Sequence, residues 1–244
     1  MEKSSSDFEE RFRDVEENFK VITGNIAKAA AESGRRPEDI TLLAATKTVP
    51  AEVINHSIAL GVKCIGENKV QELSAKYDRY DLADCSLHFI GHLQKNKVKY
   101  LIGRVSMIQS VDSEKLAQEI SRLSVNKNIT TDILIEVNIG EEPNKSGVLP
   151  QNLCSLAEKA AALPAVRVRG LMAIPPANAG YDETNGYFLR MRQYFIDIGK
   201  KKIDNISMDY LSMGMSADYM QAIRAGANMV RIGTALYGPR ARTV

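Results

Sequence analysis

Short apolar runs alternate with longer amphipathic stretches along almost the whole chain. The apolar runs are rich in Val, Ile and Leu and only a few residues long, which is typical of strands buried on both faces. The longer stretches carry apolar residues at helical spacing and begin or end at signals such as Pro50 and Gly61. The pattern predicts eight strands, at residues 40–46, 63–67, 87–91, 107–110, 131–138, 166–171, 206–211 and 229–232.

A first amphipathic helix, from about Phe8 to Glu32, precedes the strands and ends at Ser33-Gly34. Further helices are predicted after the strands, at about residues 51–60, 69–77, 95–102, 113–124, 150–163, 183–198 and 216–225. Strict alternation of strand and helix implies a parallel sheet, and eight such units in 244 residues fit a closed (β/α)8 barrel better than an open sheet. We therefore predict one α/β domain over residues 1–244, with the extra N-terminal helix at about 8–33, the barrel at about 40–239 and a loop at 175–180.

Composition and charge narrow the class of protein. The 32 basic and 30 acidic residues leave a formal net charge of +2, which argues against a dedicated nucleic-acid binder. Cys64, Cys85 and Cys154 are widely spaced and form no CxxC, so neither a disulfide framework nor a cysteine metal site is indicated. The first 20 residues lack the apolar core of a secretory signal, and no run of 18 apolar residues occurs. We therefore expect a cytoplasmic protein that does not associate with membranes.

Lys47 directly follows the first apolar strand and precedes a helix led by Pro50. A lysine at the end of a barrel strand can be partly desolvated, which lowers the pKa of its amine and lets it form an imine with an aldehyde or ketone. A solvated lysine at the end of the strand is the alternative that this residue alone leaves open. The rest of the chain must decide between the two.

Two loops have the composition of a phosphate site. In a barrel of this kind, the loops after strands seven and eight often hold a phosphate. Here they read Ser212-Met213-Gly214-Met215-Ser216 and Arg231-Ile232-Gly233-Thr234. Small residues let backbone N–H groups approach an anion, and the hydroxyls and a helix N-terminus add donors. Ser216 alone could be an ordinary helix cap and Gly233 a tight turn, but together these loops favour a phosphate.

Arg231 is placed where the eighth strand delivers a side chain to the barrel mouth. An arginine beside a pyridine nitrogen keeps that nitrogen unprotonated, because a second positive charge would be repelled. The ring would then be a poor electron sink. A surface salt bridge is the alternative, and the apolar neighbours Val230 and Ile232 make it less favoured.

Other polar residues are expected near the mouth. Asn68 can hydrogen-bond a cofactor or orient Lys47, or it can be a turn asparagine. Glu67 and Glu72 can pair with mouth lysines, although stabilisation of the following helix start is the simpler account. Further candidates for the mouth are Ser110, Asp112, Asn138 and Lys145.

Two histidines and a methionine are interpreted as structural. His88 and His92 would share a strand face if the third strand extends that far. A metal would still need a third ligand, so a hydrogen-bonded structural role is preferred and no metal is predicted. Met172, after the sixth strand, is interpreted as a packing residue.

Five segments in this order carry a resemblance to a known family: Ala45-Thr46-Lys47, 66–72, 88–97, 211–216 and 231–234. Over about residues 40–239 the chain resembles the pyridoxal phosphate homeostasis proteins, the YggS/PROSC family. The resemblance implies a barrel of the alanine racemase N-terminal type that carries pyridoxal 5'-phosphate as an imine on Lys47. The cofactor-binding residues that it implies are Lys47, Asn68, Ser212, Met213, Ser216, Arg231, Gly233 and Thr234, with the phosphate around Ser212, Ser216, Gly233 and Thr234.

The resemblance also implies a role in cofactor homeostasis without substantial catalysis. Racemases of this fold type use the lysine and a tyrosine from a second domain of the partner subunit, and this chain ends soon after the barrel. The second base is therefore expected to be missing, which makes proton exchange at an amino acid Cα slow. We expect a carrier that captures the cofactor reversibly, releases it to apoenzymes in transient contacts, and is a monomer because its site needs no partner.

Two alternatives stay open at this point. A pyridoxal phosphate enzyme with modest racemase or lyase activity would need a second base, for which Tyr210, Tyr219 and His88 are the candidates. A cofactor-free class I aldolase would use the same lysine on a phosphorylated sugar, and the phosphate loops fit it equally well.

Overall fold

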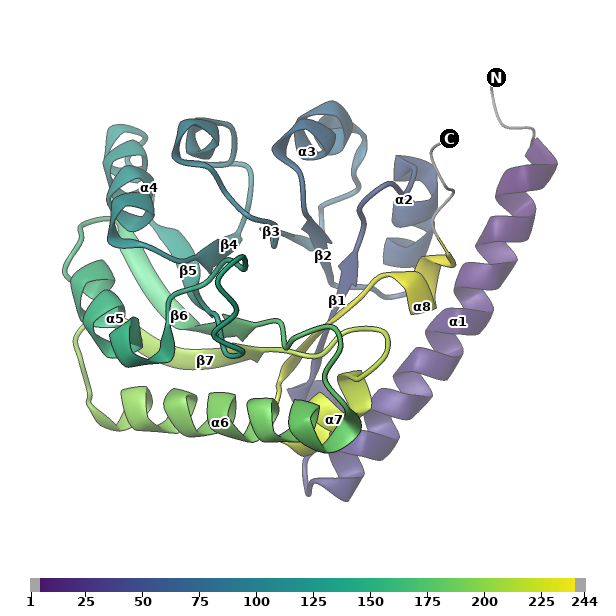
Figure 1. The fold of residues 1–244 in the computed structure, drawn as a ribbon. Coiled ribbons are helices and arrows are strands. Elements are labelled where there is room, and N and C mark those ends of the chain that lie inside the picture. The colour runs from purple at the N-terminus through teal and green to yellow at the C-terminus, as the bar shows by residue number, and fades with distance from the viewer. Residues whose placement is uncertain (1–4, 240–244) are drawn as a thin grey trace.

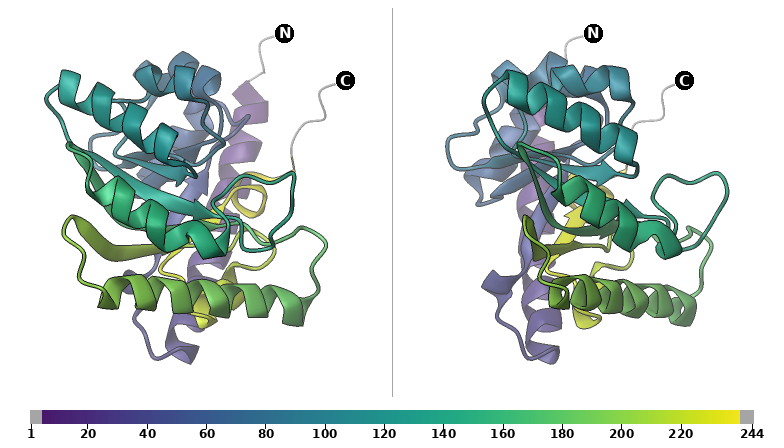
Figure 2. Two further views of the ribbon diagram at one scale, coloured as in Figure 1. Left: turned by 60° about the vertical axis from the view of Figure 1, so that its left-hand side comes forward. Right: turned by 90° about the vertical axis from the view of Figure 1, so that its left-hand side faces the viewer.

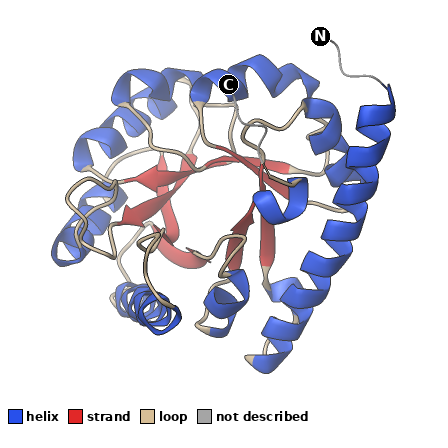
Figure 3. Cartoon of the chain, turned by 45° about the vertical axis from the view of Figure 1, so that its right-hand side comes forward, coloured by secondary structure: helices blue, strands red, loops and turns tan. Residues whose placement is uncertain are grey.

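Eight parallel strands close into a barrel in the computed structural model, which describes residues 5–239. Every strand pairs with the next in sequence, and β1 closes the ring by pairing with β8. Figure 3 shows the strands as an inner ring with the helices around it. The (β/α)8 barrel predicted from the sequence is therefore confirmed.

The strand bounds lie within two residues of those predicted. They are β1 Thr41–Ala45, β2 Cys64–Glu67, β3 Ser86–Phe89, β4 Met107–Val111, β5 Thr131–Val137, β6 Val166–Ala173, β7 Ile206–Ser212 and β8 Met229–Ile232. This agreement follows from burial on both faces, because such strands appear as continuous apolar runs.

The helices agree less well with the prediction. The α-helices are α1 Ser5–Glu32, α2 Ala51–Ala59, α3 Val70–Lys76, α4 Glu114–Asn126, α5 Leu153–Ala161, α6 Tyr181–Lys200, α7 Tyr219–Arg224 and α8 Thr234–Tyr237. Four short 3-10 helices are η1 Pro37–Asp39, η2 Tyr77–Arg79, η3 Lys95–Tyr100 and η4 Pro150–Asn152.

Three helix predictions are corrected. The segment predicted as a helix at 95–102 is the 3-10 helix η3, and η4 forms the first turn of the helix predicted at 150–163. The helix predicted from residue 216 begins only at Tyr219, because the amide of Met215 donates to the Asp218 carboxylate and closes a turn. The four-residue helix α8 was not predicted, since so short a segment carries no helical periodicity.

Apolar side chains fill the space between the barrel and the helices, and smaller clusters fill the barrel itself. One interior cluster joins Leu43, Cys64, Ile90 and Met229 from four strands or the loops that follow them. Figure 2 shows the long helix α6 running along the outside of the barrel, where it packs against β7. A filled barrel of this kind leaves room for a ligand only at its mouth.

Helix α1 covers one side of the barrel. Figure 1 shows it passing α2, α8 and α7, and it packs against all three. Its buried face carries Val15, Ile22 and Ile26. Because the strands are parallel, their carboxyl ends meet at one end of the barrel, so the loops after β1, β2, β7 and β8 converge there.

Candidate functional site

A cavity of about 630 Å³ opens at the carboxyl ends of the strands. This volume is in the range of small-molecule sites. Residues at or after the carboxyl ends of β1, β2, β3, β6, β7 and β8 line it, together with Arg11 and Asp14 from α1. Six of the eight predicted cofactor-binding residues line this cavity: Lys47, Asn68, Ser216, Arg231, Gly233 and Thr234.

Lys47 lies in a tight turn directly after β1. The turn is closed by a 3.1 Å hydrogen bond from the amide of Val49 to the carbonyl of Thr46. The Lys47 side chain is half-buried and lines the cavity. Thr48 follows with a φ of 63°, a left-handed conformation that is unusual for a β-branched residue. The sequence therefore places the amine on a short and constrained segment.

The two predicted phosphate loops are joined to each other. The hydroxyl of Ser216 accepts a 3.1 Å hydrogen bond from the amide of Ala235 in α8. Gly214 has a φ of 90°, and a Cβ there would lie 2.5 Å from the Cβ of Ala222, so only glycine fits. Gly233 lies at the start of α8, and a Cβ there would lie 3.1 Å from the carbonyl oxygen of Ala45. Small residues thus let β1, β7 and β8 converge around the cavity.

Arg231 is buried in the barrel interior, with 4% of its surface exposed. Its guanidinium donates to the hydroxyl of Ser212 at 2.7 Å and to the carbonyl of Ala173 at 2.9 Å. Burial lowers the pKa of Arg231 to about 10, so the side chain remains a cation at neutral pH. The side chain reaches the cavity already oriented by these two bonds.

Ser212 and Met213 do not line the cavity. The Ser212 hydroxyl donates to Gln109 at 2.7 Å and accepts from Arg231, so its position supports the arginine. The side chain of Met213 is fully buried in the core outside the strands. Contact of these two residues with a cofactor stays a prediction.

Glu136 is a buried carboxyl near Arg231 that sequence reasoning missed as a candidate functional residue. It lies near the end of β5 with 8% of its surface exposed, and its Oε2 atom has no hydrogen-bond partner. Burial raises the pKa of this carboxyl to about 7, and the neighbouring Asp112 acts in the same direction, whereas Arg231 opposes it. The available signal was a second acidic residue in β5, placed after the apolar residues 133–135, whereas the first, Asp132, lies at the start of the strand.

The two histidines do not share a strand face. Strand β3 ends at Phe89, and the side chain of His92 is 60% exposed on the following loop. His88 is buried and its Nδ1 lies 2.8 Å from the amide nitrogen of Gln109. Burial lowers the pKa of His88 to about 4. The expected hydrogen-bonded structural role of His88 is confirmed, and the condition for a shared face is not met, because β3 ends before His92.

The remaining candidates lie in varied surroundings. Asn138 closes its own loop by bonding the backbone of Glu142 at 2.8 and 3.2 Å, and Lys145 is exposed. Ser110 is buried and its hydroxyl has no hydrogen-bond partner. Met172 packs in the barrel interior with Met107 and Leu134, as its interpretation as a packing residue required.

Among residues 5–239, no group of three or more His, Cys, Asp or Glu side chains could hold a metal ion. No helix in this part of the chain is both long and apolar enough to cross a membrane.

Comparison with known proteins agrees with this geometry. Residues 20–241 match the family model described as the alanine racemase N-terminal domain. The chain is 44% identical over 224 residues to a pyridoxal phosphate homeostasis protein of Aquifex aeolicus, covering 92% of this chain and 97% of that protein.

Solved structures give the same picture. A protein of unknown function from Bifidobacterium adolescentis is 32% identical, with a TM-score of 0.90 and coverage of 97% of this chain and 98% of that one. PipY, the COG0325 family member of Synechococcus elongatus, was solved with PLP bound and is 32% identical, with a TM-score of 0.77 and coverage of 87% and 100%. The chain therefore belongs to the alanine racemase N-terminal domain family and, within it, to the pyridoxal phosphate homeostasis proteins.

Proposed function

We propose that this protein binds pyridoxal 5'-phosphate in the mouth of its barrel and holds it reversibly on Lys47, as a carrier of the cofactor. The observation that carries this proposal is the convergence of one amine, two small-residue loops and one oriented guanidinium on a single cavity. The names of its relatives support it, since one is called a pyridoxal phosphate homeostasis protein and another was solved with PLP.

The residues present fit the chemical groups of the cofactor. When bound, the cofactor supplies an aldehyde that condenses reversibly with a primary amine with loss of water. Lys47 supplies the amine at the cavity wall. Ser216, Gly233 and Thr234 supply hydroxyl and backbone donors for a phosphate, and Arg231 supplies a fixed positive charge for the ring nitrogen.

Arg231 is the residue that favours carriage over catalysis. Its guanidinium stays charged at neutral pH, and two hydrogen bonds fix it at the cavity. A positive charge beside the pyridine nitrogen opposes protonation of that nitrogen. An unprotonated ring stabilises negative charge poorly, so proton removal from a bound amino acid would gain little.

The candidate second bases give the racemase or lyase alternative little support. None of Tyr210, Tyr219 and His88 is among the residues that line the cavity. The hydroxyl of Tyr219 accepts a 2.9 Å hydrogen bond from Asn25 of α1, and the ring of Tyr210 faces Arg169. Tyr237 does line the cavity, but its hydroxyl lies 2.8 Å from the hydroxyl of Ser57 in α2. These contacts therefore give no tyrosine the position of a base opposite Lys47.

The test is equilibrium titration of the wild type, Lys47→Ala and a control, Lys63→Ala, with pyridoxal phosphate. Lys63 is exposed and precedes β2 at the opposite end of the barrel. We expect a visible absorption band and a borohydride-stable adduct on Lys47 in the wild type and in Lys63→Ala. Lys47→Ala should lose the adduct but keep weaker binding, because the loops and Arg231 remain.

A cofactor-free aldolase predicts a different result. It gives no band and no adduct with pyridoxal phosphate, and instead a borohydride-trapped adduct of Lys47 with a phosphorylated ketose or aldose. That outcome would replace the carrier proposal.

Three further parts of the proposal concern the protein in the cell. We propose that it passes the cofactor to apoenzymes in transient encounters, that it acts as a monomer, and that it is cytoplasmic. Size-exclusion chromatography with light scattering tests the monomer. Mixing the loaded protein with a pyridoxal phosphate apoenzyme tests transfer, because direct transfer activates the apoenzyme faster than spontaneous release allows.

A further inference from the structure

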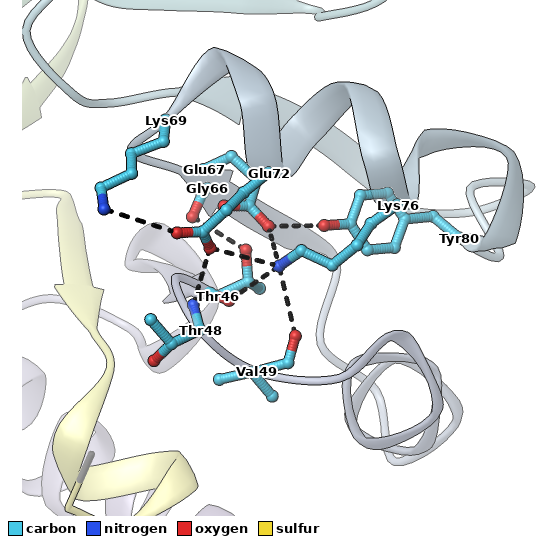
Figure 4. A network of polar contacts seen from close by, with 9 residues as sticks. All are labelled: Thr46, Thr48, Val49, Gly66, Glu67, Lys69, Glu72, Lys76 and Tyr80. Atoms are coloured by element: carbon cyan, nitrogen blue, oxygen red, sulfur yellow. Dashed lines mark hydrogen bonds and ion pairs between the residues drawn. The ribbon is translucent and has the colours of Figure 1, made fainter. Parts of the chain in front are cut away.

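A cluster of three side chains from the β2–α3 unit lies beside the turn that carries Lys47, and two of the three bond the backbone of that turn. They are Glu67 at the end of β2 and Glu72 and Lys76 in α3, and we call them the clamp (Figure 4). None of the three is among the residues that line the cavity. The clamp therefore acts on the site only through the turn.

The clamp bonds the backbone of this turn directly. The ammonium of Lys76 donates to the carbonyl of Thr46 at 3.3 Å and to the carbonyl of Val49 at 3.2 Å. The amide of Thr48 donates to Oε2 of Glu72 at 2.8 Å. These bonds hold the residues before and after Lys47, so they fix where its side chain starts.

The turn has a conformation that needs such support. Thr48 has a φ of 63°, although β-branched residues strongly disfavour this region. Backbone strain persists only where the surrounding structure holds it. The bond from the Thr48 amide to Glu72 is made at the strained residue itself. Loss of that bond would let Thr48 relax, and the adjacent Lys47 would move with it.

Within the clamp, the buried carboxylate of Glu67 holds the ammonium of Lys76 in place. Glu67 is fully buried, and its Oε1 accepts from Lys76 at 2.6 Å and from the hydroxyl of Tyr80 at 2.5 Å. The Lys76 side chain is only 12% exposed. A buried ion pair of this kind contributes little net stability, because apolar residues of similar volume often give the folded protein equal or greater stability. A role in fixing one geometry accounts better for its presence.

We propose that Glu72 and Lys76 are positioning residues for Lys47, which hold its amine at the distance and orientation needed to capture the cofactor. The inference rests on the proposed function, because it assigns these residues to the same site. Glu67 and Tyr80 fix the Lys76 ammonium, and Lys76 and Glu72 fix the turn. The clamp changes how readily Lys47 forms its adduct without touching the ligand.

A purely structural role makes a different prediction. A clamp that only joins α3 to the β1–α2 loop would change stability, and any effect on ligand binding would not depend on Lys47. A positioning role requires that the effect on binding disappears when there is no amine to position. A double-mutant cycle between Glu72 and Lys47 separates the two.

The experiment measures pyridoxal phosphate affinity and the borohydride-trapped fraction for Glu72→Ala and Glu72→Gln, each with Lys47 and with Lys47→Ala. With Lys47 present, we expect Glu72→Ala to weaken binding about tenfold, since one hydrogen bond to a charged group is lost. With Lys47→Ala, we expect less than about a twofold change. Glu72→Gln keeps an oxygen acceptor for the Thr48 amide and should retain most of the affinity.

Two further variants serve as controls. The first tests the clamp by a different substitution, and the second removes an ion pair outside the clamp. The double variant Lys76→Met with Glu67→Gln removes the Lys76 bonds without leaving a buried charge, and it should reproduce the loss seen in Glu72→Ala. Lys159→Met removes an exposed ion pair with Glu114 between α5 and α4, and it should leave affinity unchanged.

The inference is overturned if the wild type forms the adduct but Glu72→Ala changes affinity equally with and without Lys47, or not at all. If the wild type forms no adduct on Lys47, the proposed function fails and this inference fails with it. The wild-type measurement thus distinguishes the two failures.

Discussion

The guanidinium of Arg231 and the hydroxyl of Ser212 lie 2.7 Å apart in the barrel interior, with the guanidinium as donor. The hydroxyl in turn donates a 2.7 Å hydrogen bond to the side-chain oxygen of Gln109, and the Gln109 amide nitrogen lies 2.8 Å from Nδ1 of His88. One chain of hydrogen bonds therefore runs through β8, β7, β4 and β3. It fixes Arg231, the arginine that we propose lies beside the cofactor ring.

Ser212→Ala should loosen Arg231. The change removes an acceptor from the buried guanidinium and a donor from Gln109, so we expect the free energy of unfolding to fall by about 1–3 kcal/mol. Pyridoxal phosphate affinity should fall severalfold, because the arginine must be ordered on binding. Denaturant melts and equilibrium titration measure the two effects.

Ser124→Ala is the matched control for that prediction. The Ser124 hydroxyl is fully buried and lies 2.7 Å from the hydroxyl of Thr131, away from the cavity. It should lose similar stability and keep its affinity for the cofactor. Equal losses of affinity in the two serine variants would show that Ser212 has no particular link to the site.

Glu136 should make stability depend on pH. Its pKa is raised to about 7 in the folded protein from an ordinary value of 4.5, so the folded state binds the extra proton between these pH values. Through this group, the free energy of unfolding falls as pH rises from about 4.5 to about 7. The side chain of Glu136→Gln is neutral at every pH. The free energy of unfolding of this variant, relative to the wild type, should therefore increase by about 3 kcal/mol across this window and then stay constant.

Denaturant melts of both proteins at matched pH values between 4 and 8 check this. The comparison cancels the contribution of His88, whose depressed pKa of about 4 makes the free energy of unfolding rise with pH between about 4 and 6.5. A difference between Glu136→Gln and the wild type that does not vary with pH would contradict the buried-carboxyl account.

Gly91→Ala should disturb the mouth at Asn68. A Cβ at Gly91 would lie 2.0 Å from the backbone carbonyl oxygen of Asn68, so the backbone must shift. We expect a loss of about 1–3 kcal/mol in the free energy of unfolding and weaker cofactor binding, because Asn68 lines the cavity. Gly24→Ala lies within α1 with no atom within 4 Å of the new Cβ, and it should stabilise by about 1 kcal/mol. Normal cofactor affinity in Gly91→Ala would argue against Asn68 as part of the site.

The cysteines should differ in reactivity. Burial raises the pKa of Cys64 to about 12 and that of Cys85 to about 11, whereas Cys154 is partly exposed. A thiol reagent should label Cys154 in the native protein and all three cysteines after denaturation. Native labelling of Cys64 at a rate similar to that of Cys154 would contradict the closed barrel around it.

The sequence could predict the barrel and much of the site for one physical reason. Parallel strands buried on both faces appear as apolar runs, and the barrel rule then places Lys47, Ser216 and Arg231 at one mouth. Contacts between elements could not be predicted in this way. The pair of Lys76 and Glu67 joins α3 to the end of β2, and no periodicity marks it.

The sequence pattern misled or was silent where the local geometry of the chain decides the position of a residue. A period of two aligns His92 with His88 only if the third strand reaches His92, but β3 ends at Phe89 and the chain then packs its Gly91 against Asn68. Glu136 was overlooked because acidic residues near the two ends of β5 do not interrupt its apolar centre. Its importance appears only when the unpaired oxygen and the nearby Arg231 are seen together.

Capture of pyridoxal phosphate by Lys47 can be detected in a single experiment. The purified protein is mixed with the cofactor, its visible spectrum is recorded, and borohydride reduction is followed by peptide mass mapping. We expect an absorption band and a single adduct on Lys47. Absence of the band and of any adduct, or an adduct confined to other lysines, would contradict it.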